Sequence, residues 1–215
     1  MLEVKFRMKL SCWIILVSLC DFDCPAFRIS KAYNLFMSTP NNTESLVLNT
    51  NFISGISSSV FILINLQILD LDKNFIEELP TDITLPLSGG SLQHLYLSNN
   101  KLTTISDELF KLKQVTNLWL SNNRITSTIP TDIGMMTNLQ ELDLESNLFE
   151  GSIPTELYSL SKLHTLILHD NLLSGSISPL ISQMTSLRIL DLDSNAISGE
   201  LPAQIGFLSQ LSQLQ

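Results

Sequence analysis

Leucine and isoleucine recur at a fixed spacing along most of the chain, and the clearest copy is LQELDLESNLFEGSIP at residues 139–154. Leucines fill its first, fourth and sixth positions, and Asn147 and Phe149 follow. Residues two apart point to the same face of a strand, so Leu142 and Leu144 are predicted to face a core and Asp143 to face outward. The pattern therefore predicts a short strand with one buried side.

The same pattern recurs from residue 46 to the end of the chain. From the second copy onward, its first apolar residue falls at positions 66, 92, 115, 139, 163, 187 and 211, in steps of 26, 23, 24, 24, 24 and 24 residues. The longest step contains SGGS at Ser88–Ser91, which is typical of a loop insertion. A fixed period of this length identifies a repeat protein, in which each unit buries its apolar faces against its neighbours.

An asparagine occupies the same phase of every repeat. Its amide offers two donors and an acceptor, which suits the closure of a buried turn through backbone groups. We therefore predict a structural asparagine ladder made of Asn51, Asn74, Asn100, Asn123, Asn147, Asn171 and Asn195. Beyond the asparagine, apolar residues at a spacing of three, as in Ile133, Met136 and Leu139, predict a short helical or 3-10 return on the opposite side.

These repeats resemble the leucine-rich repeat family over roughly residues 43–215. The GxIP form in residues 123–211 is similar to the plant-type subclass, which is common in receptor-like proteins, and the earlier repeats are similar to the general 23-residue form. The resemblance implies an α/β solenoid: a horseshoe of about seven repeats, with a parallel concave sheet and short helical or 3-10 convex returns. It does not specify a ligand, because a fold does not determine what a protein binds.

The N-terminal residues differ from the repeats. Lys5, Arg7 and Lys9 precede an apolar run at residues 10–20, and we predict a signal peptide at residues 1–20. The run is shorter than a membrane-spanning helix requires. The alternatives are an uncleaved signal anchor and an apolar cap on the first repeat.

The sequence divides further into a linker or irregular N-terminal cap at residues 21–42 and a repeat domain at residues 43–215. Asn41 begins a glycosylation sequon, Asn41-Asn42-Thr43. The last repeat has no cap, and the chain stops within a predicted strand at Leu214-Gln215, so we expect the domain to be truncated at its C-terminus. A segment after Gln215 would be a second means of membrane attachment, besides an N-terminal signal anchor.

Charge narrows the class of partner. The chain carries 12 basic and 21 acidic residues, for a formal net charge of −9. Nucleic acids and anionic membrane surfaces favour basic patches, so this balance argues against both. We expect a protein or peptide partner, which can be basic.

Function in a solenoid is expected on the outward strand face. There Tyr96 and Trp119 are predicted to be adjacent exposed aromatics, and Ser98 and Ser121 are predicted to point outward beside them. Aromatic residues often anchor interfaces, and acidic residues select basic partners. The candidate ligand-binding residues are Tyr96, Trp119, Glu141, Asp143, Glu145, Asp191 and Asp193. The alternative is a solvated face whose charges only maintain solubility.

No motif predicts an enzyme, a metal site or a cofactor. Cys12, Cys20 and Cys24 all precede the repeats and have no zinc-site spacing. His94 and His169 are predicted three strands apart, about 14 Å, which is too far for one proton relay. His169 and Asp170 are predicted to form a surface pair.

Three functions remain in view. The first is a non-enzymatic protein- or peptide-binding module, secreted or at the cell surface, as a receptor-like ectodomain or a fragment of one. The second is a cytoplasmic scaffold or adaptor. The third is the sensing part of a receptor kinase whose catalytic region is absent from this sequence.

Overall fold

The computed structural model describes residues 43–81, 83 and 90–215. The predicted signal peptide at residues 1–20, the predicted linker or cap at residues 21–42, the three cysteines and Asn41 all lie outside the described residues.

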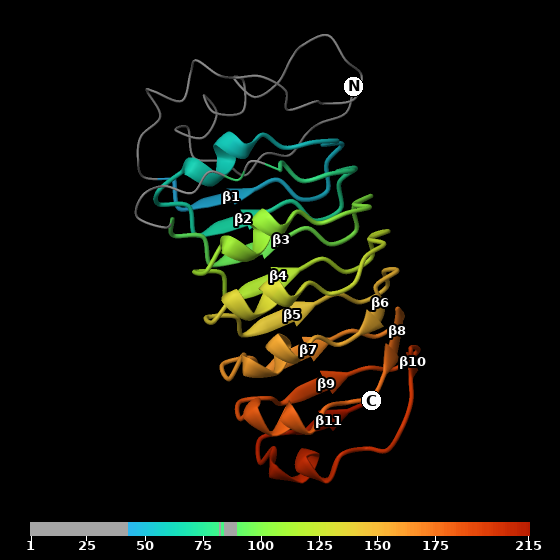
Figure 1. Cartoon of the computed structure of the whole chain (residues 1–215). Helices are drawn as coiled ribbons and strands as arrows, with labels where there is room; N and C mark the ends of the chain where they lie inside the picture. The colour runs from blue at the N-terminus through green and yellow to red at the C-terminus, as the bar shows by residue number, and fades with distance from the viewer. Residues whose placement is uncertain (1–42, 82, 84–89) are drawn as a thin grey trace.

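One strand from each successive repeat joins a single large sheet (Figure 1). All neighbouring pairs are parallel, and the order in the sheet is the order along the chain. The strands are β1 (Ser45–Val47), β2 (Ile68–Asp70), β3 (His94–Tyr96), β4 (Asn117–Trp119), β5 (Glu141–Asp143), β7 (Thr165–Ile167), β9 (Ile189–Asp191) and β11 (Gln213–Leu214). This arrangement confirms the predicted solenoid with a parallel sheet.

Short 3-10 helices return the chain between strands, as the three-residue apolar spacing predicts. They are η2 (Ser58–Ile62), η3 (Asp107–Lys111), η4 (Thr131–Met135), η5 (Thr155–Ser159), η6 (Pro179–Gln183) and η7 (Ala203–Phe207). In η4, Ile133 is buried, and the N–H of the following Met136 donates to the carbonyl of Ile133. Met135 is exposed and Met136 is fully buried, which fits one outward and one inward position.

A second, smaller sheet lies along a separate edge of the stack (Figure 1). It consists of β6 (Glu150–Ser152), β8 (Leu172–Gly175) and β10 (Ala196–Ile197), again in parallel. Gly151 and Gly175 lie within it with φ of +76° and +78°, a conformation that L-amino acids rarely adopt. This backbone requirement explains the glycine of the GxIP motif.

The core is continuous from repeat to repeat. The middle residues of the large-sheet strands point into it, and Leu69, Leu95, Leu118 and Leu142 have no exposed surface. Each such leucine stacks between the equivalent residues of its neighbours, so stability is shared along the array rather than held by one unit.

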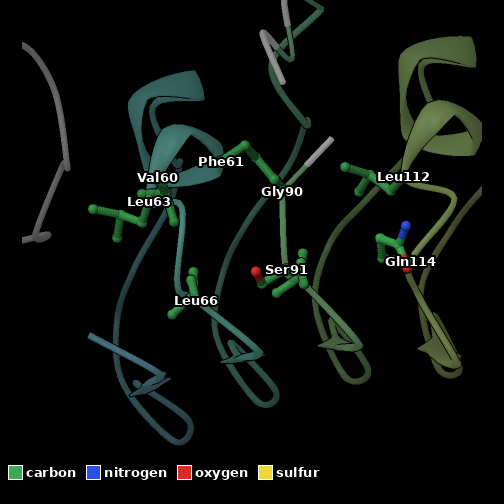
Figure 2. Close-up of a pocket in the computed structure, with 9 residues that line it drawn as sticks. Val60, Phe61, Leu63, Leu66, Gly90, Ser91, Leu112 and Gln114 are labelled. Atoms are coloured by element: carbon green, nitrogen blue, oxygen red, sulfur yellow. The ribbon is translucent and has the colours of Figure 1, made fainter. Parts of the chain in front are cut away.

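A small apolar hollow interrupts the packing near the insertion between the second and third repeats. Figure 2 shows it lined by residues that include Val60, Phe61, Leu66, Gly90 and Leu112. Its volume is about 10 Å³, which is room for no more than one water molecule. The hollow is therefore too small to hold a ligand.

Candidate ligand-binding face

Six of the ladder asparagines join neighbouring repeats beside the large sheet. The Nδ2 group of Asn147 donates to the carbonyls of Leu120, at 2.9 Å, and Leu144, at 3.1 Å. Its Oδ1 atom accepts from the N–H of Ile125, at 3.1 Å. The equivalent three bonds are made by Asn74, Asn100, Asn123, Asn171 and Asn195. Each amide thus joins its own repeat to the preceding one.

Asn51 occupies the first position of this ladder. Its Nδ2 group donates to the carbonyls of Leu48 and Asn49, which belong to its own repeat. Within the described residues, its side chain closes a turn of its own repeat and bonds to no other repeat.

The strand register brings the outward residues into columns. Asp70, Tyr96, Trp119, Asp143, Ile167 and Asp191 are successive partners in the central column. Glu141 is the partner of Asn117 in the column beside it. We call the surface formed by these outward residues and those just after the strands the sheet face.

Tyr96 and Trp119 form an aromatic pair at the centre of this face. Their ring centroids are 4.4 Å apart, with the planes tilted by 42°. The indole Nε1 of Trp119 donates to Oε2 of Glu141 at 3.3 Å, which holds the ring beside an acid. Both aromatics are half-buried, not exposed as predicted, because the two rings in contact cover part of each other's surface.

A shallow hollow opens beside Trp119 on the sheet face. It has a volume of about 190 Å³ and is lined by Trp119, Glu141, Leu142, Asp143, Thr165 and Ile167. The hollow combines an aromatic wall, an aliphatic wall and two carboxylates, which together can hold an amphipathic side chain.

Asp143 is held in place by a backbone donor. Its Oδ1 atom accepts from the N–H of Glu145 at 3.0 Å. Burial raises the pKa of Asp143 above its ordinary value, although this bond, the nearby Ser121 hydroxyl and the nearby His169 oppose the shift. A ligand cation placed beside Asp143 would favour its charged form.

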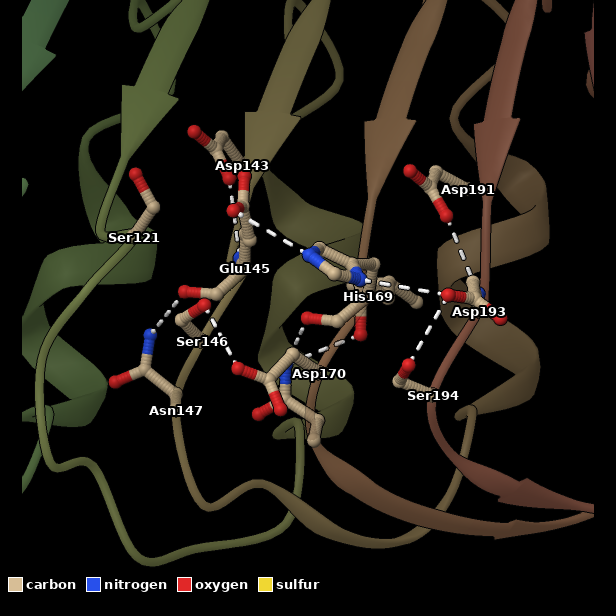
Figure 3. A network of polar contacts seen from close by, with 12 residues as sticks. Ser121, Asp143, Glu145, Ser146, Asn147, His169, Asp170, Asp191, Asp193 and Ser194 are labelled. Atoms are coloured by element: carbon tan, nitrogen blue, oxygen red, sulfur yellow. Dashed lines mark hydrogen bonds and ion pairs between the residues drawn. The ribbon is translucent and has the colours of Figure 1, made fainter. Parts of the chain in front are cut away.

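Glu145 and Asp193 approach one histidine from two sides (Figure 3). The Nε2 atom of His169 lies 3.4 Å from Oε1 of Glu145, and Nδ1 lies 3.9 Å from Oδ2 of Asp193. The predicted surface pair of His169 with Asp170 is wrong in its partner, because Asp170 accepts from Ser146 instead, at 2.9 Å. The sequence contains a signal for this contact: Glu145, His169 and Asp193 follow one another at intervals of 24 residues, the length of one repeat, so they occupy the same position in successive repeats.

Two positions predicted to point outward are buried. Ser98 and Ser121 lie just past their strands, where Asn99 and Asn122 turn the chain with positive φ. The hydroxyl of Ser121 donates to that of Ser98 at 2.9 Å. Short polar side chains can be buried here because they bond to each other instead of to water.

An acid outside the candidate set, Asp72, lies beside these serines. Its Oδ1 atom accepts from the N–H of Ser98 at 2.6 Å. Burial raises the pKa of Asp72 to about 6, with a further contribution from the negative charge of Asp70. Asp72 extends the acidic part of the sheet face toward the first repeats, on the far side of the aromatic pair.

Neither a metal centre nor a membrane span is found in the described part of the chain. No group of three or more histidine, cysteine, aspartate or glutamate side chains there could hold a metal ion. Within the same residues, no helix has the length and apolar character to cross a bilayer.

Two family models match this chain, both described as leucine rich repeat, over residues 90–149 and 186–208. These two segments match leucine-rich repeats, and the chain has a leucine-rich repeat fold. The matched segments include strands β3, β4, β5 and β9, and so the repeats that carry the aromatic pair and most of the acidic residues.

Curated proteins similar to this leucine-rich repeat chain are much longer than the region they share with it. Adenylate cyclase of Schizosaccharomyces pombe is 32% identical over 107 residues, which are 50% of this chain and 6% of that protein. Lumican of Gallus gallus is 39% identical over 102 residues, which are 46% of this chain and 27% of that protein. The chain therefore spans well under two thirds of these relatives.

Solved structures of plant receptors share the fold. The plant peptide hormone receptor RGFR1 in complex with RGF2 has a TM-score of 0.70 at 34% identity, over 77% of this chain and 27% of that one. The Arabidopsis receptor kinase HAESA, in complex with the peptide hormone IDA and the co-receptor SERK1, has a TM-score of 0.72 at 33% identity, over 80% and 29%. The chain thus shares its repeat fold with 27% and 29% of these two receptor chains.

Proposed function

We propose that the domain is a non-enzymatic module that binds a peptide or an extended protein segment on its sheet face. The observation that carries this proposal is the Tyr96–Trp119 pair, whose indole bonds to Glu141 beside a hollow that also contains Asp143. Tyrosine and tryptophan supply large contact areas and are enriched among residues that dominate binding energy.

The chemistry of the face favours a ligand with basic side chains. Glu141 and Asp143 line the hollow, and Asp70 and Asp191 lie in the central column on either side. Opposite charges speed encounter and disfavour acidic competitors. A purely solvating role would require neither the orientation of Trp119 toward Glu141 nor the partial burial of Asp143.

The peptide class of ligand is supported by the two plant receptor structures, since each contains a bound peptide hormone. A second HAESA structure, with a TM-score of 0.73 at 33% identity, is of its leucine-rich repeat ectodomain with an IDA peptide hormone ligand that is lengthened at its N-terminus. We extend that mode of binding to this chain, together with a secreted or cell-surface location.

The binding proposal can be tested by selecting peptides from a random display library on the full chain. Peptides that bind the native chain are compared on Trp119→Ala and on a control, Lys113→Glu/Lys162→Glu, whose exposed lysines belong neither to the strands nor to the lining of the hollow. We expect a class enriched in lysine and arginine that loses affinity at least roughly tenfold on Trp119→Ala and keeps it on the control. If the affinity of the selected peptides is unchanged on Trp119→Ala, the binding site is not at the aromatic pair.

The location requires a separate test. The full chain is expressed in plant cells, and the N-terminus of the mature protein is determined by mass spectrometry. A chain recovered outside the cell without residues 1–20 supports the receptor-like role. A cytosolic chain that retains Met1 would instead favour the scaffold alternative.

A further inference from the structure

A second surface lies to the side of the sheet face, at the residue directly after each of the first six ladder asparagines. We call it the flank ridge, and it consists of Phe52, Phe75, Lys101, Arg124, Leu148 and Leu172. The order along successive repeats is two aromatic residues, two cations and two leucines.

The flank ridge is regular because its backbone repeats the same hydrogen bond. The N–H of Lys101 donates to the carbonyl of Ile76, and the N–H of Arg124 donates to that of Leu102, both at 2.9 Å. Equivalent bonds hold Phe75, Leu148 and Leu172. The ridge side chains therefore occupy equivalent positions in successive repeats. Each one is held in place because it directly follows a ladder asparagine.

Large apolar side chains are exposed at both ends of the ridge. Phe52 and Phe75 are 54% and 38% exposed, and Leu148 and Leu172 are 43% and 55% exposed. The two phenylalanine rings stack with centroids 5.7 Å apart and planes 5° apart. Single exposed apolar residues are ordinary, but an ordered series of them indicates an interaction surface.

The middle of the ridge is positively charged. The Nζ atom of Lys101 lies 4.8 Å from the centroid of the Phe75 ring, which positions the ammonium group against the aromatic pair. Neither Lys101 nor Arg124 forms an ion pair with any residue that the structure describes. Both cations line a hollow of about 760 Å³, and Glu77 and Glu78 line the same hollow. The flank thus presents two cations that form no ion pair within the described residues, beside two carboxylates.

We propose that the flank ridge is a docking surface for a second protein, whose contact region presents carboxylates flanked by apolar side chains. The carboxylates pair with Lys101 and Arg124, and the apolar groups cover Phe52 and Phe75 at one end and Leu148 and Leu172 at the other. The hollow beside the cations has the volume of a pocket that takes a short segment of a partner. This surface is separate from the aromatic pair, so one chain can hold a basic ligand and an acidic partner together.

The test uses a random peptide display library on the full chain, with two ridge variants. Lys101→Glu/Arg124→Glu reverses the charges, and Phe75→Ser/Leu148→Ser removes apolar surface. Both pairs of side chains lie outside the core, so thermal melting should show that the variants fold. Lys113→Glu/Lys162→Glu makes the same change in net charge at exposed positions away from the ridge.

We expect a class of peptides with aspartate or glutamate beside apolar residues. Their affinity should fall at least roughly tenfold on each ridge variant and stay unchanged on the control. Replacing their acids with lysine should restore binding to Lys101→Glu/Arg124→Glu. If no such class is found, or if the selected peptides lack acids, the proposal fails.

Dextran sulfate distinguishes a protein partner from a polyanion. If it competes fully for the ridge, and Phe75→Ser/Leu148→Ser has no effect on peptide binding, the ridge is only a charged patch and the proposal is wrong. Basic peptides that lose affinity on Trp119→Ala but not on the ridge variants bind the sheet face. The proposal for the sheet face and the proposal for the flank ridge can therefore be disproved separately.

Discussion

The rings of Tyr96 and Trp119 lie 4.4 Å apart on adjacent parallel strands, although 23 residues separate them in the chain. The backbones of the two residues are direct partners in the sheet, so the strand that carries Tyr96 fixes the position of Trp119 in the next repeat. The pair is consequently a property of two stacked repeats and not of either one alone.

Trp119→Ala should weaken ligand binding and cost little stability. The substitution removes the tilted aromatic contact with Tyr96, which is worth about 1 kcal/mol, and leaves the core intact. Chemical denaturation of the two proteins measures the difference.

Leu142→Ala, one repeat further along the chain, should instead reduce the stability of the fold. Leu142 has no exposed surface, and its truncation should cost about 2–5 kcal/mol through lost burial and a cavity. Equal losses of stability from both substitutions would show that the inward and outward positions are assigned incorrectly.

Asn147→Ala should destabilise the domain strongly. It removes the donors to the carbonyls of Leu120 and Leu144 and the acceptor for the N–H of Ile125. Each buried group left without a partner costs about 1–3 kcal/mol, so the free energy of unfolding should fall by at least about 3 kcal/mol. Urea titration followed by circular dichroism gives the value.

Asn51→Ala is the matched control, because it changes the same residue type at the same position of the motif. Asn51 bonds only within its own repeat among the described residues, and it is partly exposed. Its loss should be clearly smaller than that of Asn147. A loss as large as that for Asn147→Ala would argue against cross-repeat bonding as the source of stability.

Stability should decline as the pH rises through the titration of Asp72. Its pKa is about 6 in the folded chain and 3.8 as an ordinary value, so the folded state keeps a proton that the unfolded state has released. The stabilising effect of this proton is complete below pH 3.8 and is lost as the pH passes 6. Melting temperatures across this range, compared between the native chain and Asp72→Asn, isolate the effect.

Asn at position 72 keeps an oxygen that can accept from the N–H of Ser98, so the hydrogen bond survives without the charge. The native chain should lose stability relative to Asp72→Asn between pH 4 and 6. Parallel pH profiles for the two proteins would contradict the raised pKa.

Gly151→Ala should destabilise the small sheet. Gly151 has φ of +76°, and an added Cβ atom would lie 3.1 Å from Cγ2 of Thr128. Left-handed backbone costs an L-amino acid about 1–2 kcal/mol. Gly206→Ala is the control, because that glycine has open space around it and its φ is not in the positive range. There, alanine should be neutral or stabilise by about 0.4–1 kcal/mol, and differential scanning calorimetry can compare the two.

The sequence by itself determined the parts of this protein that depend on period. A two-residue alternation decides which side chain of a strand faces the core, and a repeat of 23 or 24 residues decides which side chains share a column. These rules predicted the buried Leu142 and the neighbouring positions of Tyr96 and Trp119 before any contact was known. They also placed the six cross-repeat asparagines at one phase.

Only the tertiary structure decided how close and how buried the side chains of neighbouring repeats are. The two serines, Ser98 and Ser121, became buried because the chain turns just past each strand and brings their hydroxyls together. His169 found Glu145 and Asp193 rather than Asp170, since side chains on stacked repeats can be nearer than side chains adjacent in sequence. The flank ridge also depends on stacking. The periodic sequence determines the direction in which each ridge side chain points, whereas the stacking of repeats determines which side chains lie beside it.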